Sequence, residues 1–287
     1  MNSQTSEKLM SWTVHVMAAM SIVCVFLIGL FIFAKGIPPM FTIGLQDFLL
    51  GTSWRPTDVP PTYGIFPMII GSMLVTLGAI LMGGPVALAA AVCLSFFAPE
   101  KWRRVLRSLV LLLAGIPSIV YGFFGMVVMV PMVREYLGGN GNSVFTAALL
   151  LAIMILPTII SVSESALSTV PDRYYEGGRA LGLTHERTVV GIMVPAASGG
   201  ILASFVLGIG RAVGETMAVI MVAGNQAVIP SSLWDGTRTL TANVVLEMGY
   251  AADLHREALI ATGAILFIMI LLLNTLFLFL RERLVKS

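Results

Sequence analysis

Charged side chains are scarce in this sequence, and their scarcity excludes an ordinary soluble domain. Only 11% of the 287 residues are Asp, Glu, Lys or Arg, and 57% are hydrophobic. Soluble proteins carry roughly 25% charged residues and mix them through the chain. Here the charges are confined to short blocks between long apolar runs. Because a membrane span needs about 20 predominantly apolar residues, these runs predict transmembrane helices.

Other absences exclude several classes of function. Cys24 and Cys93 lie in separate apolar runs, so neither a disulfide framework nor a thiolate metal site is predicted. His15, His185 and His255 are scattered without metal-ligand spacing. No basic patch with interleaved aromatics supports nucleic-acid binding. The sequence contains no G-x-x-x-x-G-K-[ST] loop and no nucleophile–base arrangement, so we predict no cofactor, no catalytic residues and no enzyme activity.

Six apolar segments predict an all-α, polytopic membrane protein. They lie at about 13–34, 67–97, 108–133, 144–165, 196–224 and 258–280. The first, at 22 residues, is longer than the apolar core of a signal peptide (about 7 to 15), so we interpret it as an uncleaved span. Gly and Pro interrupt the second and third segments. Such interruptions are tolerated where neighbouring helices satisfy the freed backbone groups, so these two segments are predicted to lie against other helices.

Lys and Arg are distributed unequally between the two sides of the predicted membrane. With the N-terminus inside, eleven fall on the cytoplasmic side and five outside. The positive-inside rule therefore predicts that both termini are cytoplasmic. We expect a single transmembrane domain at 13–280, with a core at about 67–280, between cytoplasmic tails at 1–12 and 281–287. No extramembrane stretch is long enough to build an independent core.

The cytoplasmic loop 166–195 carries the most specific pattern in the chain. It reads Glu176-Gly177-Gly178, three residues, Gly182, nine residues, then Ile192-Met193-Val194-Pro195. This resembles the E-A-A–x3–G–x9–I-x-L-P signature of permease subunits of bacterial ABC importers. Gly stands for Ala at the second and third positions, and Val for Leu near the end. The resemblance implies a type I importer permease fold in the cytoplasmic membrane, and a loop that docks on a separate ATPase subunit.

The residues of this loop fit a docking helix on their own terms. Pro171 can begin a helix at its first turn, and Gly182 is a typical residue just past a helix C-terminus. Leu181 and Leu183 are apolar residues in a polar loop, which suits burial against a partner. The resemblance assigns ATPase coupling to Glu176, Gly177, Gly178, Ala180, Leu181 and Gly182. The alternative is an amphipathic helix lying on the membrane surface.

A second pattern narrows the choice within that family. The fifth segment contains G-R-A-V-G-E-T-M-A-V at 210–219, and the third contains A-G-I-P-S-I-V-Y-G at 114–122. Both resemble the phosphate-specific branch. The M-A-V ending, in place of A-P-L, implies that the partner is a second, PstA-like permease. The resemblance also implies two ATPase subunits and an external phosphate-binding protein. Rival interpretations are an ABC permease for molybdate, sulfate or phosphonate, and, less close, a secondary anion transporter.

Arg211 and Glu215 are the only charges well inside an apolar segment. Arginine at a bilayer centre costs about 2.5 to 3.5 kcal/mol on insertion scales, so it usually faces a bundle interior or a water-filled path. Phosphate is anionic and keeps a proton at neutral pH. An arginine fork can bind two of its oxygens while a carboxylate accepts its O–H. We therefore predict a substrate path lined by Arg211, Glu215 and Thr216.

The alternatives for this pair are structural or gating roles. Four residues apart on one helix face, Arg211 and Glu215 can pair with each other and hold two permease subunits together.

Overall fold

The protein is described here by a computed structural model that covers residues 3–286; residues 1–2 and 287 lie outside the description. Its long elements are α1 (Ser3–Ile43), α3 (Phe66–Val92), α7 (Val144–Ser168), α11 (Ser198–Gly214) and α14 (Asp253–Lys286). A π-helical turn, η1 (Cys93–Phe97), continues α3. The shorter elements are α2 (Leu45–Leu50), β1 (Trp54–Arg55), β2 (Thr62–Tyr63), α4 (Glu100–Gly115), α5 (Ser118–Phe124), η2 (Gly125–Met129), α6 (Val130–Tyr136), α8 (Asp172–Ala180), α9 (His185–Thr188), η3 (Val189–Met193), α10 (Val194–Ala196), α12 (Met217–Val222) and α13 (Leu240–Glu247). β1 and β2 form one antiparallel pair.

The prediction of an all-α membrane protein is confirmed. Among the described residues, five helices are long and apolar enough to cross a membrane. A sixth is added if 185–196 and 198–214, which meet at a bend of 69°, are counted as one span. The six correspond in order to the six predicted apolar segments.

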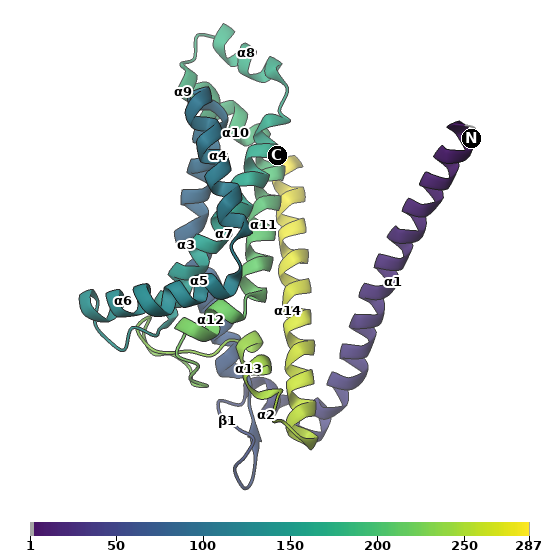
Figure 1. Cartoon of the computed structure of the whole chain (residues 1–287), viewed down its shortest axis with the longest axis vertical. Coiled ribbons are helices and arrows are strands. Elements are labelled where there is room, and N and C mark those ends of the chain that lie inside the picture. Colours follow the sequence, from purple (N-terminus) through teal and green to yellow (C-terminus); the bar gives the residue numbers. More distant parts are fainter. Residues whose placement is uncertain (1–2, 287) are drawn as a thin grey trace.

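Helix α7 is the most deeply buried of the candidate spans and forms the centre of the bundle (Figure 1). Small residues bring its neighbours close. A Cβ added to Gly83 of α3 would lie 2.7 Å from the backbone oxygen of Ala152. On the α11 side, the hydroxyls of Ser163 and Ser204 are 2.8 Å apart in a buried hydrogen bond. Close approach of small residues and polar contacts between helices are how membrane helices pack without a hydrophobic driving force.

Helix α1 contacts the bundle only along part of its length. It packs on α14 where Gly36 approaches Ala264, whose Cβ would be 3.0 Å from a Cβ added to the glycine. Toward its N-terminus it diverges from every other helix (Figure 1). The apolar side chains of this part are exposed in the isolated chain, which in a membrane leaves them for lipid or another subunit.

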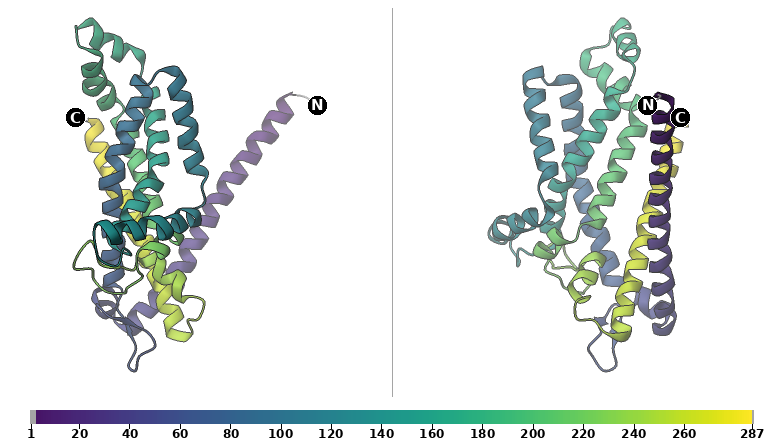
Figure 2. Two further views of the ribbon diagram at one scale, coloured as in Figure 1. Left: turned by 60° about the vertical axis from the view of Figure 1, so that its left-hand side comes forward. Right: turned by 45° about the vertical axis from the view of Figure 1, so that its right-hand side comes forward.

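The third predicted segment is not one helix, so the range 108–133 is wrong as a single span. Helix α4 ends at Gly115, and the chain is extended at Ile116 and Pro117 before α5 begins. The reason is local: a residue before proline is disfavoured in the α conformation, and proline has no N–H to continue the ladder. Figure 2 shows α5 and α6 running across the bundle instead of continuing α4.

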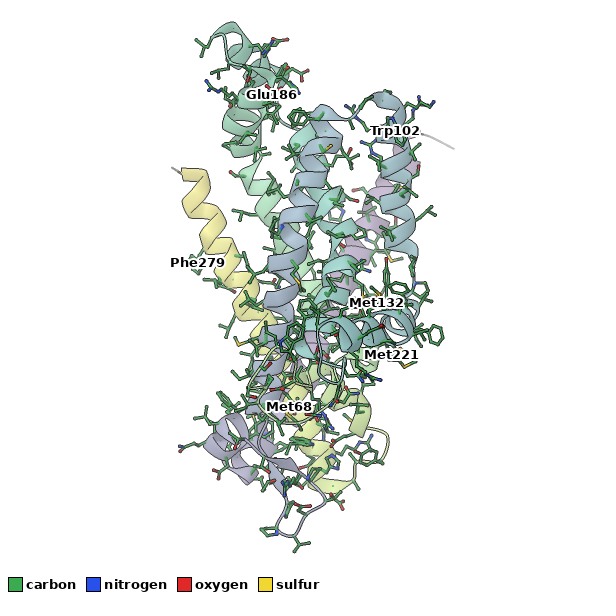
Figure 3. All side chains as sticks on the ribbon, turned by 90° about the vertical axis from the view of Figure 1, so that its left-hand side faces the viewer. Met68, Trp102, Met132, Glu186, Met221 and Phe279 are labelled. Atoms are coloured by element: carbon green, nitrogen blue, oxygen red, sulfur yellow. The ribbon has the colours of Figure 1, made fainter. Side chains whose placement is uncertain are left out.

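One end of the molecule carries α8, and both chain ends point the same way (Figure 1). Figure 3 shows Glu186 and Trp102 at this end, with Met68 toward the opposite end. We call it the inner end, following the predicted orientation, which stays a prediction. The predicted tails, 1–12 and 281–287, are helical where they fall within the described residues, and their cytoplasmic location is likewise a prediction.

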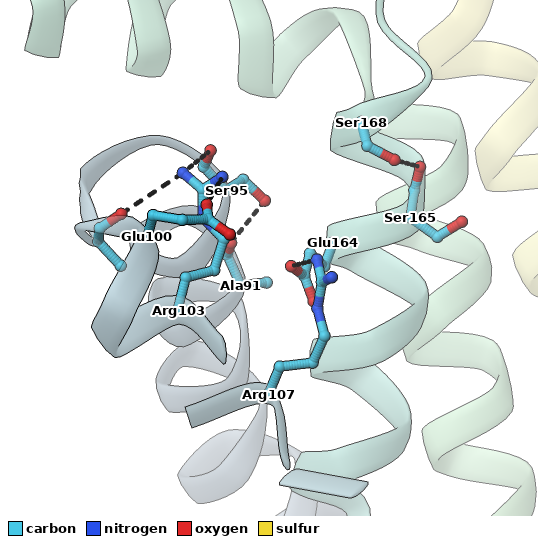
Figure 4. A network of polar contacts seen from close by, with 9 residues as sticks. Ala91, Ser95, Glu100, Arg103, Arg107, Glu164, Ser165 and Ser168 are labelled. Carbon is cyan, nitrogen blue, oxygen red and sulfur yellow. Dashed lines mark hydrogen bonds and ion pairs between the residues drawn. The ribbon is translucent and has the colours of Figure 1, made fainter. Parts of the chain in front are cut away.

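An ion-pair network joins α4 to its neighbours at the inner end (Figure 4). Arg107 of α4 is paired with Glu164 of α7, and Arg103 lies 3.5 Å from Glu100 one turn earlier. Arg103 also donates to the carbonyl of Ala98, 3.4 Å away, just past η1. These contacts fix α4 beside α3 and α7 although no side chain of α4 is buried.

Candidate functional site

The fifth predicted segment breaks at the predicted substrate residues. Helix α11 ends at Gly214, and Glu215 has an extended backbone (φ −70°, ψ 129°). Thr216 then precedes α12 as its N-cap. The prediction that Arg211 and Glu215 share one helix face is therefore wrong. Within the described part of the chain no ion pair joins them.

The carboxylate of Glu215 caps the start of α12. Its Oε1 accepts hydrogen bonds from the backbone N–H groups of Thr216 and Ala218, both at 3.1 Å. These N–H groups have no partner inside the helix, and a negative charge is favoured at the positive end of the helix dipole. The hydroxyl of Thr241 donates to the Glu215 carbonyl at 3.2 Å, which ties α13 to the break. Glu215 thus has a structural task that the sequence pattern did not indicate.

The side chain of Thr216 also has a local structural role. Its hydroxyl donates to the carbonyl of Gly214 at 3.2 Å. The turn it forms places α12 beside α5, where a Cβ added to Gly122 would lie 2.9 Å from the Cα of Ala218. The G-E-T part of the motif therefore builds a sharp turn within the membrane region.

Arg211 points away from this turn toward α7 and α14. Its Nη1 donates to the hydroxyl of Thr158 on α7 at 3.3 Å. The residue also lines a cavity of about 600 Å³ between α11 and α14. The lining consists of Leu202, Ala203, Val206, Leu207, Gly210, Arg211, Asn274 and Phe277. Arg211 and Asn274 supply the polar groups of an otherwise apolar lining, and neither Glu215 nor Thr216 belongs to it.

Asn274 was missed by sequence reasoning, although the signal was there. It is a single amide within the apolar sixth segment, between Leu273 and Thr275. Polar side chains in membrane helices usually face a partner or a water-filled cavity. An amide offers two donors and one acceptor oxygen, and a guanidinium offers five donors. Together with Arg211 it makes a positively charged site that can bind an oxyanion and also accept a hydrogen bond from it.

The residues predicted to couple to an ATPase lie on and just after α8. Pro171 precedes the helix as its N-cap, and Gly182 follows it with φ +83°, a left-handed conformation that favours glycine. The N–H of Leu183 donates to the Gly178 carbonyl at 3.2 Å, and that of Gly182 to the Arg179 carbonyl at 3.0 Å. This pair of bonds closes the helix C-terminus in a Schellman arrangement.

The two glycines of the loop signature differ in environment. A Cβ on Gly178 would lie 2.7 Å from Thr188 Cγ2 and 2.7 Å from Ile192 Cδ1, whereas one on Gly177 would meet nothing within 4 Å. Gly178 thus lets α8 lie directly against α9 and η3. The other coupling residues are exposed, namely Glu176, Gly177, Ala180, Leu181 and Gly182. Leu181 is 83% exposed, the most exposed apolar side chain of this loop.

A third polar cluster lies at the end opposite α8 and centres on Glu247, which is 6% exposed. Its carboxylate accepts from Arg238 at 2.5 Å and from the indole N–H of Trp54 at 2.8 Å, and lies 2.9 Å from His255 Nε2. These four residues come from β1, the loop before α13, α13 and α14. The cluster therefore joins the segment around β1 to the segment that contains α13 and the start of α14.

These features define a multi-pass membrane protein: a helical bundle with an arginine-lined cavity between α11 and α14 and an exposed helix, α8, at one end. Residues 83–287 match the family model described as "Binding-protein-dependent transport system inner membrane component", and the chain belongs to that family. The resemblance on which the sequence prediction rested is therefore confirmed.

Curated relatives cover most of the chain. It is 38% identical to the "Probable ABC transporter permease protein YqgH" of Bacillus subtilis, over 89% of this chain and 84% of that protein. It is 34% identical to the "Phosphate transport system permease protein PstC" of Haemophilus influenzae, over 80% of each. A PstC of Mesorhizobium japonicum is 33% identical over 86% of this chain and 81% of that protein.

Solved structures agree on the fold. A chain of the MetNI methionine ABC transporter in an inward-facing conformation superposes with a TM-score of 0.58 at 20% identity, covering 77% of this chain and 94% of that one. A chain of a bacterial ABC transporter involved in alginate import gives 0.62 at 12% identity, covering 98% and 99%. The fold is therefore that of an ABC importer permease.

Proposed function

We propose that this chain is a permease subunit that translocates inorganic phosphate through an ABC importer. The PstC relatives support phosphate as the substrate. The observation that carries the proposal within the chain is the cavity between α11 and α14, where Arg211 and Asn274 stand in an otherwise apolar lining. A partly buried cation among apolar side chains attracts an anion more strongly than one in water, because the surrounding dielectric is lower.

Arg211 is the principal substrate group of the proposed path. Its hydrogen bond to Thr158 uses one of five guanidinium donors, so a fork remains for two phosphate oxygens. Glu215 and Thr216 lie at the break after α11, outside this cavity, and we infer that phosphate meets them at a separate point on the path, where the Glu215 carboxylate accepts its O–H. This arrangement disfavours sulfate, which brings no proton to the carboxylate.

The α8 segment is the proposed contact with the ATPase. Leu181 is 83% exposed at the end of the helix, where a partner can bury it. We infer a complex of this chain with a PstA-like permease, two cytoplasmic ATPase subunits and an external phosphate-binding protein. ATP binding brings the ATPases together, moves α8 and opens the path outward; hydrolysis returns it inward.

Uptake by the complete transporter in proteoliposomes tests the substrate. We expect ATP-dependent uptake of radiolabelled phosphate that excess sulfate does not reduce. If molybdate, sulfate or a phosphonate competes better than unlabelled phosphate, the chain is a permease for that oxyanion. Uptake by the purified single chain, without ATPase, would establish a secondary transporter instead.

A substitution at the end of α8 tests the coupling surface. Leu181→Asp places a charge at the proposed interface, and we expect the ATPase to be lost from the purified complex. Val59→Asp is the matched control, because Val59 is equally apolar and 99% exposed but lies in the β1–β2 hairpin loop at the other end of the molecule. Retention of the ATPase by Leu181→Asp would contradict the proposed docking.

A further inference from the structure

His185 connects the α8 segment to the inner end of α3. Its Nδ1 lies 2.8 Å from the hydroxyl of Tyr175 on α8, and its Nε2 lies 3.2 Å from the backbone carbonyl of Phe96 in η1. The imidazole also packs against Phe97 in a T-shaped contact, with ring centroids 4.8 Å apart. We call the series Tyr175–His185–Phe96 the His185 bridge.

The carbonyl at one end of the bridge determines where the ring proton lies. Because the Phe96 carbonyl can only accept, Nε2 of His185 must carry the proton that it donates. In the neutral imidazole Nδ1 is then an acceptor, which matches the donor hydroxyl of Tyr175. Both ring nitrogens are therefore used, one toward α8 and the other toward α3.

The bridge gives α8 a second connection to the bundle. The first runs through α9 and η3, against which Gly178 packs, and leads through α10 into α11. The second branches from the first residue of α9, His185, and runs to η1 and α3, which packs along α7. Helices α11 and α7 carry Arg211 and Thr158, the hydrogen-bonded pair at the membrane cavity. A displacement of α8 is therefore transmitted to the helices of both Arg211 and Thr158.

We propose that His185 is a positioning residue that makes α3 follow the movement of α8 during the transport cycle. The inference rests on the proposed docking of the ATPase at α8. With the bridge intact, α11 and the α3–α7 pair move together and the path opens as a unit. Without it, α8 still binds the ATPase and hydrolysis continues, but α3 follows less well and more ATP is consumed for each phosphate imported.

Three conservative variants test the bridge. Tyr175→Phe removes one oxygen, and His185→Phe removes both ring nitrogens but keeps an aromatic ring beside Phe97. Tyr136→Phe is the matched control: Tyr136 is an exposed tyrosine at the end of α6, outside the α8 segment, and its hydroxyl makes no hydrogen bond within the described residues. The measurement is phosphate imported per ATP hydrolysed by assembled complexes in proteoliposomes.

We expect this ratio to fall about threefold to tenfold in Tyr175→Phe and in His185→Phe, the effect of one net hydrogen bond on an equilibrium. It should not change in Tyr136→Phe. Because the bridge acts as one unit, the double variant of Tyr175 and His185 should be no worse than His185→Phe alone.

Two results would overturn the inference. One is a wild-type ratio in both bridge variants. The other is a reduced amount of assembled complex with an unchanged ratio, which would show that His185 only holds the loop in place. Failure of the underlying docking proposal gives a different result, because Leu181→Asp would then retain the ATPase. Loss of the ATPase in Leu181→Asp with a normal ratio in the bridge variants would contradict the bridge alone.

Discussion

Gly177→Ala and Gly178→Ala are expected to have opposite effects on the stability of α8, although the two glycines are adjacent in sequence. The Cβ of Gly178→Ala would come within 2.7 Å of Thr188 Cγ2 and of Ile192 Cδ1. The Ile192 methyl can move, but Thr188 is fully buried and its hydroxyl donates to the Thr184 carbonyl at 2.9 Å. Overpacking of this kind typically costs about 1–3 kcal/mol. Gly177→Ala meets open space and should stabilise α8 by about 0.5–1 kcal/mol.

Amide hydrogen exchange of residues 172–180 in the solubilised complex measures this difference directly, because local opening is an equilibrium with its own free energy. Since 1.4 kcal/mol is about a tenfold change, Gly178→Ala should speed exchange by about fivefold to a hundredfold. Gly177→Ala should slow it by about twofold to fivefold. Equal exchange in the two variants would refute the close packing of α8 on Thr188 and Ile192.

Three further predictions concern the outer end and the helix break. Glu247→Ala leaves the partly buried Arg238 without its carboxylate, so we expect a loss of up to about 3 kcal/mol, seen as a lower thermal midpoint in detergent. The loss should be smaller for Glu247→Gln. Hydrogen bonds from the hydroxyl and N–H of Ser231 lower the pKa of the Asp235 carboxyl below its usual value of 3.8. The ionised carboxylate should therefore stabilise loop 225–239 fully above pH 3.8, and this stabilisation should be lost as the pH falls through the lowered pKa. Proteolysis of this loop should therefore increase at acidic pH in the wild type but not in Asp235→Asn. Glu215→Gln keeps an acceptor oxygen for the N-terminus of α12 and should assemble normally, whereas Glu215→Ala should lower the yield of folded complex by removing the cap, worth about 1 kcal/mol.

The sequence predicted those parts of the fold that depend on local chemistry. Apolar runs gave the candidate spans, because burial in a bilayer requires long apolar helices. Pro171 and Gly182 gave the limits of α8, because proline suits a helix start and a left-handed residue suits its end. The glycine interruption of the second segment correctly predicted that it lies against another helix, because Gly83 packs directly against the backbone of Ala152 on α7.

The features that were missed depend on tertiary contacts. Pro117 was noticed, but nothing local showed that α5 would turn across the bundle. Glu215 was interpreted as a helix-face partner of Arg211, since nothing local showed that the helix ends at Gly214. The break is stabilised by the Glu215 cap and by Thr241, which is 26 residues away in sequence. Asn274 reaches the Arg211 cavity from another helix, and sequence spacing cannot show which spans are neighbours.

The central claim is that Arg211 serves the phosphate path. Phosphate uptake in cells, with all partner proteins present and expression matched, tests it most directly in Arg211→Gln. The control is Arg256→Gln, which changes an exposed arginine near the start of α14.

We expect uptake at low phosphate to fall about tenfold to a hundredfold in Arg211→Gln, the loss of charged hydrogen bonds worth about 1.5–3 kcal/mol, while the complex assembles and keeps its ATPase. Arg256→Gln should transport normally. Uptake at the wild-type rate in assembled Arg211→Gln would contradict the account and move the substrate site away from this cavity.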